Sequence, residues 1–157
     1  SKFPAIHSQT IRGNYAKTAS FSDLGDNFFA CIQRPNKFLA DLNINIIEHC
    51  RELLDITTPL LRSSRMKGAG SKAHLLAALC EEVGGTEYIS VAGSKSYLDE
   101  SDAFNEIGIP VRYFNYCHPT YLQLFGDFVP YMSIIDMLFN CGETSVSLIK
   151  SGVEISS

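Results

Sequence analysis

The chain of 157 residues has no tryptophan, no excess of basic residues and no long apolar run. Its formal net charge of −4 disfavours nucleic-acid binding, which depends on a basic surface. No apolar stretch approaches the ~20 residues of a transmembrane helix, and the first residues lack the apolar core of a signal peptide. We therefore expect a cytoplasmic protein with no membrane span and no nucleic-acid partner.

The five cysteines are odd in number and form no Cys-x-x-Cys pair. This pattern is typical of reduced thiols that act as small apolar residues in a cytosolic protein, rather than of a secreted disulfide framework. A metal site needs ligands clustered at short spacing, and here only Cys117 and His118 with the distant Asp136 and Cys141 could combine. We therefore predict no metal and no cofactor.

The length and the 45% hydrophobic content suit a single domain over residues 1–157. Before residue 58, apolar residues recur at helical spacing, which predicts helices over 5–16, 21–33 and 37–54. Asn36 is a candidate cap of the third helix. His49 lies beside that helix's apolar stripe, and we interpret it as a structural histidine with satisfied hydrogen bonds.

After residue 58 the apolar period alternates between strand and helix. The predicted strands are 59–64, 88–91 and 110–114; a helix from Ser71 to Val83 and a helix closed by Gly108 separate them. Such short crossovers are right-handed and give a parallel sheet. We therefore expect an α/β fold, a small parallel Rossmann-like sheet with a helical N-terminal layer. Residues 1–57 would form the helical segment, 58–142 the βαβαβ unit with a C-terminal helix, and 143–157 a tail.

Ligands of open parallel sheets bind beyond the carboxyl ends of the strands, which selects the loops 63–72, 92–97 and 115–123. The first loop is basic and glycine-rich, and it either binds phosphate at a helix N-terminus or is a solvated loop. The second either contacts an anionic or sugar ligand or caps the next helix. The candidate binding residues are Ser64, Arg65 and Lys72 in the first loop and Gly93, Ser94 and Tyr97 in the second.

The third loop carries His118, which the following proline holds extended, as a candidate acid–base group near neutral pH. Tyr121 and Gln123 face the same way if this stretch is extended, and they suit hydrogen bonding to a sugar or amide. Ser133 and Asp136 open the next helix like a capping box, and we favour this structural account over a catalytic one. Asn140 and Gly142 then mark the end of that helix.

Four ordered segments carry a family resemblance. They are Tyr88-Ile89-Ser90-x-x-Gly93-x-x-x-Tyr97-Leu98-Asp99, Phe104-x-x-x-Gly108-Ile109-x-Val111, His118-Pro119-x-Tyr121-x-Gln123 and Phe128-x-Pro130-x-x-Ser133-Ile134-Ile135-Asp136-x-Leu138-Phe139-Asn140-x-Gly142. Over about Tyr15 to Gly142 the chain closely resembles the C-terminal part of the WbqC-like family. The family's opening segment, His-Gln-Pro-x-Tyr-x-Pro-Trp-x-Gly, is absent, which indicates a shortened relative or part of a larger protein. A sheet edge left exposed by that absence would favour a homodimer or a companion N-terminal segment.

The resemblance implies a bacterial-type role in surface polysaccharide biosynthesis of the O-antigen kind. The expected partner is a nucleotide sugar or another small phosphorylated ligand, and a transferase activity such as acyl or aminoacyl transfer to an amino sugar is our leading hypothesis. His118 would be the general acid or base, with Ser133 or Asp136 supporting it. Tyr121 and Gln123 would orient the sugar, with Asn140 nearby, while the loops 63–72 and 92–97 would hold phosphate. The alternative is a non-catalytic module that binds a sugar or a partner within a polysaccharide assembly complex.

Overall fold

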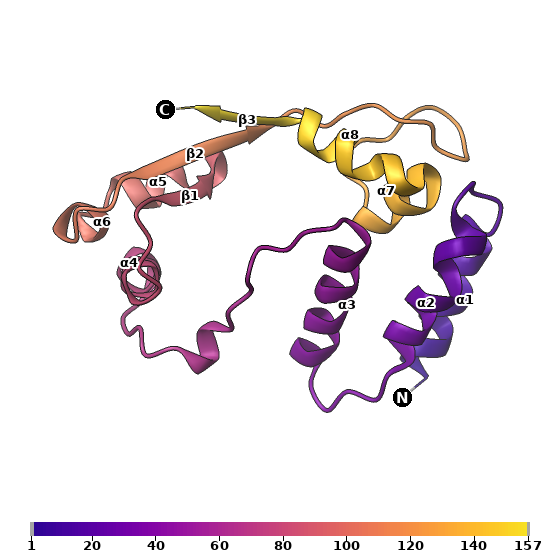
Figure 1. Cartoon of the computed structure of the whole chain (residues 1–157), viewed down its shortest axis with the longest axis horizontal. Coiled ribbons are helices and arrows are strands. Elements are labelled where there is room, and N and C mark those ends of the chain that lie inside the picture. The colour runs from indigo at the N-terminus through magenta and orange to yellow at the C-terminus, as the bar shows by residue number, and fades with distance from the viewer. Residues whose placement is uncertain (1, 157) are drawn as a thin grey trace. The chain divides into compact units, whose positions relative to one another are not determined.

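The computed structural model describes residues 2–156, which sort into two units (Figure 1). Unit 1 contains the described residues up to Thr58 together with His118–Ser151. Unit 2 contains Pro59–Cys117 and the described residues from Gly152 onward. The single domain expected over residues 1–157 stays a prediction, because it concerns how these two units fold together.

The three helices predicted in the first 57 residues are present in unit 1. They are α1 (Phe3–Tyr15), α2 (Phe21–Gln33) and α3 (Leu39–Leu53). The predicted cap of α3 is wrong, because Phe38 precedes this helix and makes no side-chain cap bond. The Asn36 side chain instead donates to the Arg34 carbonyl and accepts from Asn45. It thereby ties the α2–α3 connection to α3.

An aromatic core joins α2 to α7 (Ile134–Cys141) within unit 1. Phe139 of α7 is 2% exposed, and its ring lies 5.2 Å from that of Phe21 and 5.8 Å from that of Phe28. Burying an aromatic side chain of this kind contributes roughly 1.5–3 kcal/mol. The apolar stripes predicted from the sequence therefore pack against one another. A short 3₁₀ turn connects α7 to α8 (Ser145–Ser151).

His49 departs from its sequence interpretation as a satisfied structural histidine. Its Nε2 atom is buried, and it has no hydrogen-bond partner among the described residues. The His49 ring packs 6.1 Å from that of Phe28.

Unit 2 is built on a three-stranded sheet of order β1-β2-β3 (Figure 1). The strands β1 (Tyr88–Val91) and β2 (Val111–Tyr116) pair in parallel, in a register that sets Tyr88 opposite Val111. The strand β3 (Val153–Ser156) pairs antiparallel with β2. The α/β fold class with a parallel strand pair is therefore confirmed.

The predicted strand at 59–64 is wrong. Residues 59–62 have no regular structure, and Ser63–Arg65 form a 3₁₀ turn. Leu60 and Leu61 remain 50% and 65% exposed. Burial of these side chains therefore does not stabilise a strand here. The third strand comes instead from the segment 143–157, which the sequence analysis left as a tail.

The helix α4 (Lys72–Glu82) is present where Ser71 to Val83 predicted it, and Gly84, with a φ of 68°, follows its end. The single helix predicted up to Gly108 is wrong, because α5 (Lys95–Asp99) and α6 (Ala103–Glu106) replace it. A small-residue core packs α4 against these helices. Its buried members are Ala73, Ala77, Cys80, Leu98, Ala103 and Phe104.

The five cysteines are free thiols, and burial raises the pKa of Cys31, Cys50 and Cys80. These three side chains therefore act as small apolar groups, as the sequence predicts. Within residues 2–156, none of the helices combines the length and hydropathy needed to cross a bilayer.

Gly142 offers a test of the junction between α7 and the chain before α2. Its φ of 54° is unfavourable for other residues, and a Cβ there would collide with the Ser20 hydroxyl. We expect Gly142→Ala to lower the free energy of unfolding by about 1–3 kcal/mol in urea denaturation. Gly13→Ala is the matched control, because Gly13 lies within α1 with open space around its Cα and should become slightly more stable. Unchanged stability of Gly142→Ala would contradict this account.

Candidate functional site

Asp136 is the centre of a polar cluster in unit 1. It lies in the first turn of α7 and is 6% exposed. Its carboxylate accepts hydrogen bonds from the Tyr121 hydroxyl at 2.8 Å and from Gln123 Nε2 at 2.9 Å. A buried carboxylate needs such donors, because an unpaired charge out of water is very costly. We call Asp136, Tyr121, Gln123 and Tyr15 the Asp136 cluster.

The capping account of Ser133 and Asp136 is wrong. Ser133 precedes α7 but makes no side-chain cap bond, and its carbonyl accepts only the Asp136 backbone N–H, at 2.9 Å. The Asp136 side chain is used by the Asp136 cluster instead. The sequence indicates part of this cluster, because the spacing of Tyr121 and Gln123 predicts that both side chains lie on one side of an extended stretch.

Tyr15 of α1 is the third donor, and the sequence analysis did not select it. Burial, and next to it the hydrogen bond to Asp136, raise the pKa of Tyr15 to about 12. The same two causes raise the pKa of Tyr121. Both phenols therefore remain protonated donors at neutral pH. A tyrosine at the end of an apolar helical stripe is predicted to be a core residue. The sequence pattern therefore does not indicate that Tyr15 donates a hydrogen bond to a carboxylate.

Gln123 also closes the loop that follows it. Its Nε2 donates to the Val129 carbonyl at 3.0 Å, and its Oε1 accepts the Val129 N–H at 2.8 Å. Asn140 joins from α7, where its Nδ2 donates to the Asp136 carbonyl at 2.8 Å. These bonds fix the side chains around a cavity of about 350 Å³. Its lining residues are Asn14, Tyr15, Gln123, Leu124, Phe125, Val129, Met132, Asp136 and Asn140.

His118 stands beside this cluster in an aromatic setting. Its Nδ1 lies 2.9 Å from the Pro119 carbonyl oxygen, which can only accept, so Nδ1 carries a hydrogen. The ring lies 5.0 Å from that of Tyr131 and 6.0 Å from that of Tyr121. Among the described residues, His118 is not part of the cavity lining, and Tyr121 contacts both His118, through its ring, and Asp136, through its hydroxyl.

The basic loop of unit 2 already holds an anion supplied by the chain itself. The Glu82 carboxylate of α4 accepts the backbone N–H of Lys67, at 2.9 and 3.0 Å, and that of Gly68, at 2.8 Å. A Cβ at Gly68 would lie 2.8 Å from Leu79 Cδ2, so glycine permits this close approach. The predicted phosphate-binding residues Ser64, Arg65 and Lys72 are exposed around this loop.

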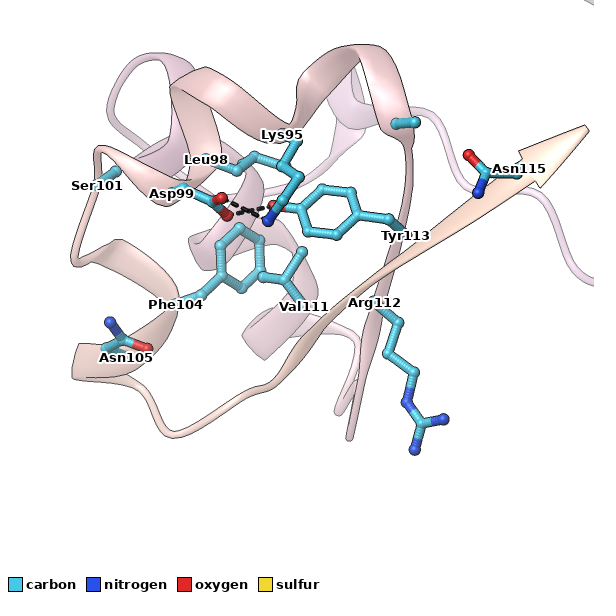
Figure 2. A pocket seen from close by; sticks show the side chains of 11 residues that line it. Lys95, Leu98, Asp99, Ser101, Phe104, Asn105, Val111, Arg112, Tyr113 and Asn115 are labelled. Carbon is cyan, nitrogen blue, oxygen red and sulfur yellow. Dashed lines mark hydrogen bonds and ion pairs between the residues drawn. The ribbon is translucent and has the colours of Figure 1, made fainter. Parts of the chain in front are cut away.

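The second loop of unit 2 leads into a charged cluster that the sequence analysis missed. Gly93 and Ser94 lie in a 3₁₀ turn, and Tyr97 is 40% exposed on α5. Asp99 forms an ion pair with Lys95 Nζ at 2.6 Å and accepts from the Tyr113 hydroxyl at 2.9 Å (Figure 2). The spacing of Lys95 and Asp99, four residues apart on a helix, was a usable signal.

The predicted site residues thus fall into two groups. His118, Tyr121, Gln123, Ser133, Asp136 and Asn140 belong to unit 1, while Ser64, Arg65, Lys72, Gly93, Ser94 and Tyr97 belong to unit 2. Their meeting at one rim stays a prediction, since it joins residues of both units. Within residues 2–156, no group of three or more His, Cys, Asp and Glu side chains is placed to hold a metal ion.

Comparison with known proteins points to one family. The sequence model of the WbqC-like protein family matches residues 1–148. The uncharacterized protein Rv1507c of Mycobacterium tuberculosis (strain ATCC 25618 / H37Rv) is 34% identical over 138 residues, which cover 87% of this chain and 59% of that protein. The chain therefore spans less than two thirds of the length of this relative. No solved structure matches significantly.

The raised pKa of Tyr15 predicts a loss of stability in alkaline solution. Between pH 10 and about 12 the unfolded chain releases a phenol proton that the folded chain keeps, so unfolding becomes easier as the pH rises. Below pH 10 both states keep the proton and this effect vanishes. Tyr15→Phe should flatten the decline in urea-denaturation stability between pH 10 and about 12. The control is Tyr131→Phe at a 72% exposed position, which should decline as the wild type does. Equal slopes for wild type and Tyr15→Phe would refute the assignment.

The Glu82 contact predicts slow hydrogen exchange in the basic loop. Glu82→Ala should speed amide exchange at Lys67 and Gly68 by about tenfold, because both N–H groups lose a charged acceptor. Hydrogen–deuterium exchange followed by NMR measures this directly. Glu81→Ala, a change at the exposed neighbour, should leave both amides as they are in the wild type. Unchanged exchange in Glu82→Ala would show that the carboxylate does not hold the loop.

Proposed function

The chain belongs to the WbqC-like protein family, and from this membership we propose that it serves surface polysaccharide biosynthesis by modifying a nucleotide-linked sugar. The observation that carries the proposal is the Asp136 cluster beside its cavity. The substrate would place one sugar ring there. The size of the cavity, about 350 Å³, lies in the range of small-molecule sites.

The chemistry of the lining supports sugar recognition. Sugars present hydroxyl groups that both donate and accept, and carboxylate and amide side chains match them in a fixed geometry. Asn14, Gln123 and Asp136 supply such groups on one cavity. Phe125 supplies an apolar surface for the C–H face of a ring. Because Gln123 and Asp136 are held by other side chains, little ordering would remain to be done on binding.

We assign the reaction as acyl or aminoacyl transfer to an amino sugar. The sugar nitrogen attacks the carbonyl carbon of an activated acyl donor, a thioester or an ester. His118 Nε2 accepts the proton that the nitrogen loses, and it returns that proton to the departing sulfur or oxygen as the old acyl bond breaks. Such a base suits neutral pH and contributes typically 10²–10⁴-fold in rate. The Pro119 carbonyl, by holding Nδ1–H, sets the tautomer that this step requires.

Phosphate binding in unit 2 would depend on exposed side chains rather than on the loop backbone. The N–H groups of Lys67 and Gly68 are held by Glu82, and Lys95 is paired with Asp99. Arg65 and Lys72 are exposed and would supply the positive charge.

The second candidate is a non-catalytic module that binds a sugar or a partner. Two observations favour it. His118 is not among the residues that line the cavity, and several large apolar side chains of the same stretch are exposed, with Leu122 at 88% and Phe125 at 65%. Exposed apolar groups near one another are typical of contact surfaces.

One experiment separates the two candidates. The full chain is incubated with a uridine-diphosphate-linked amino sugar and an acyl thioester, and the sugar's mass is followed. We expect acylation by the wild type and a loss of about 100-fold or more in His118→Ala, with nearly unchanged Tm because the ring is partly exposed. His74→Ala, at an exposed position of α4, is the control and should keep full turnover. Wild-type turnover in His118→Ala would refute the catalytic role, and sugar binding without any mass change would favour the module.

A further inference from the structure

Unit 2 contains a second cavity, of about 580 Å³, beside the parallel strand pair (Figure 2). It begins at Ala92, directly after β1, and continues along the face of β2 that carries Val111, Tyr113 and Asn115. The helices α5 and α6 complete its lining. A position beyond the carboxyl end of one parallel strand and beside the next is where α/β folds bind ligands.

We propose that this cavity binds a neutral, hydroxyl-rich ligand of the sugar class. The inference goes beyond the function proposed above and uses residues of unit 2 alone. It rests on three features of the lining: compensated charge, a fixed polar edge and an apolar floor.

Charge compensation disfavours an anionic ligand. The lining contains the cations of Lys95 and Arg112. Lys95 is paired with Asp99 at 2.6 Å, and Arg112 is paired with Glu87. A phosphate would have to compete with a carboxylate for either cation. A neutral ligand meets no such competition.

The polar edge is fixed before any ligand arrives. Asp99 uses one oxygen for Lys95 and the other for the Tyr113 hydroxyl, while the Lys95 ammonium lies 4.7 Å from the centroid of the Tyr113 ring. Burial and Asp99 raise the pKa of Tyr113 to about 12, so the phenol stays a donor. The carboxylate oxygens retain lone pairs and the ammonium retains hydrogens for further bonds. This edge can therefore donate to and accept from hydroxyl groups.

Two amides extend this edge. Figure 2 shows Asn105 and Asn115 on either side of the Lys95–Asp99–Tyr113 cluster. Neither side chain has a hydrogen-bond partner among the described residues, and each offers both a donor and an acceptor. Each amide therefore adds a donor and an acceptor for a hydroxyl-rich ligand at its own end of the cavity.

The floor is apolar. Its accessible apolar member is the half-buried Val111, while Leu98 and Phe104, at 4% and 3% exposed, line the cavity from the packed core. A sugar ring has a C–H face as well as a hydroxyl rim, and it matches a site with an apolar floor and a polar edge. A phosphate or a small carboxylate has no such apolar face.

Nitrogen-edited NMR spectra of the full chain test this assignment, with methyl α-glucoside and N-acetylglucosamine as probes. We expect both probes to shift the side-chain amides of Asn105 and Asn115 and the backbone amides of Lys95–Asp99. The double variant Asn105→Ala/Asn115→Ala should bind about tenfold more weakly. Asn43→Ala, at an exposed position of α3, is the matched control and should bind like the wild type.

Several outcomes would overturn the assignment. One is that inorganic phosphate shifts these resonances and the sugars do not. Another is unchanged sugar binding in the double variant, whose two exposed positions should not impair folding. Shifts confined to Gln123 and Asn140 would refute this second site while leaving the function proposed for the Asp136 cluster intact.

Discussion

The burial of one carboxylate organises the irregular part of unit 1. Between His118 and the start of α7 the chain forms no helix or strand, so its polar groups have no regular ladder to satisfy them. Asp136 provides a fixed acceptor for Tyr121 and Gln123, and Gln123 in turn pairs with both backbone groups of Val129. If that carboxylate were lost, three donors would be left without an acceptor in a partly buried setting, which is costlier than losing a surface ion pair.

Carboxylates play a similar part in unit 2. Glu82 accepts two backbone N–H groups of the basic loop, and Asp99 holds Lys95 and Tyr113. Each carboxylate accepts hydrogen bonds from groups in a loop for which the sequence predicts phosphate binding. A sequence motif identifies the hydrogen-bond donors of a loop. A carboxylate on the following helix, such as Glu82, can already accept from these donors. These two carboxylates therefore have a structural use, because each one occupies donors that a bound anion would otherwise contact.

The sequence predicted those elements whose pattern is long and locally consistent. The apolar stripes of α2, α3 and α4 and the strands β1 and β2 lie where the periodicity placed them. Sequence periodicity failed where a contact with a distant segment decides the structure. Residues 59–64 have the pattern of a strand, but their apolar side chains Leu60 and Leu61 stay exposed. The strand β3 forms because it pairs with an edge of β2. The sequence prediction also failed at Asp136, since a local pattern, serine three residues before an acid, predicts a cap. The carboxylate instead meets Tyr121, fifteen residues earlier in the chain, and Tyr15 of α1. Only the folded chain supplies such contacts.

The residues that the sequence analysis assigns to one site differ in what they contact in the structure. The Tyr121 hydroxyl gives its hydrogen to Asp136, so it could contact a ligand only as an acceptor. Gln123 and Asp136 reach the cavity and can contact a ligand, whereas His118 has its tautomer set by Pro119 and its ring held by Tyr131 and Phe128. Because His118 does not line the cavity, the proposed proton transfer would need a substrate whose reacting atom extends out of the cavity to His118. An amino sugar bound by its hydroxyl rim, with its nitrogen directed out of the cavity, would meet that requirement of the proposed transfer.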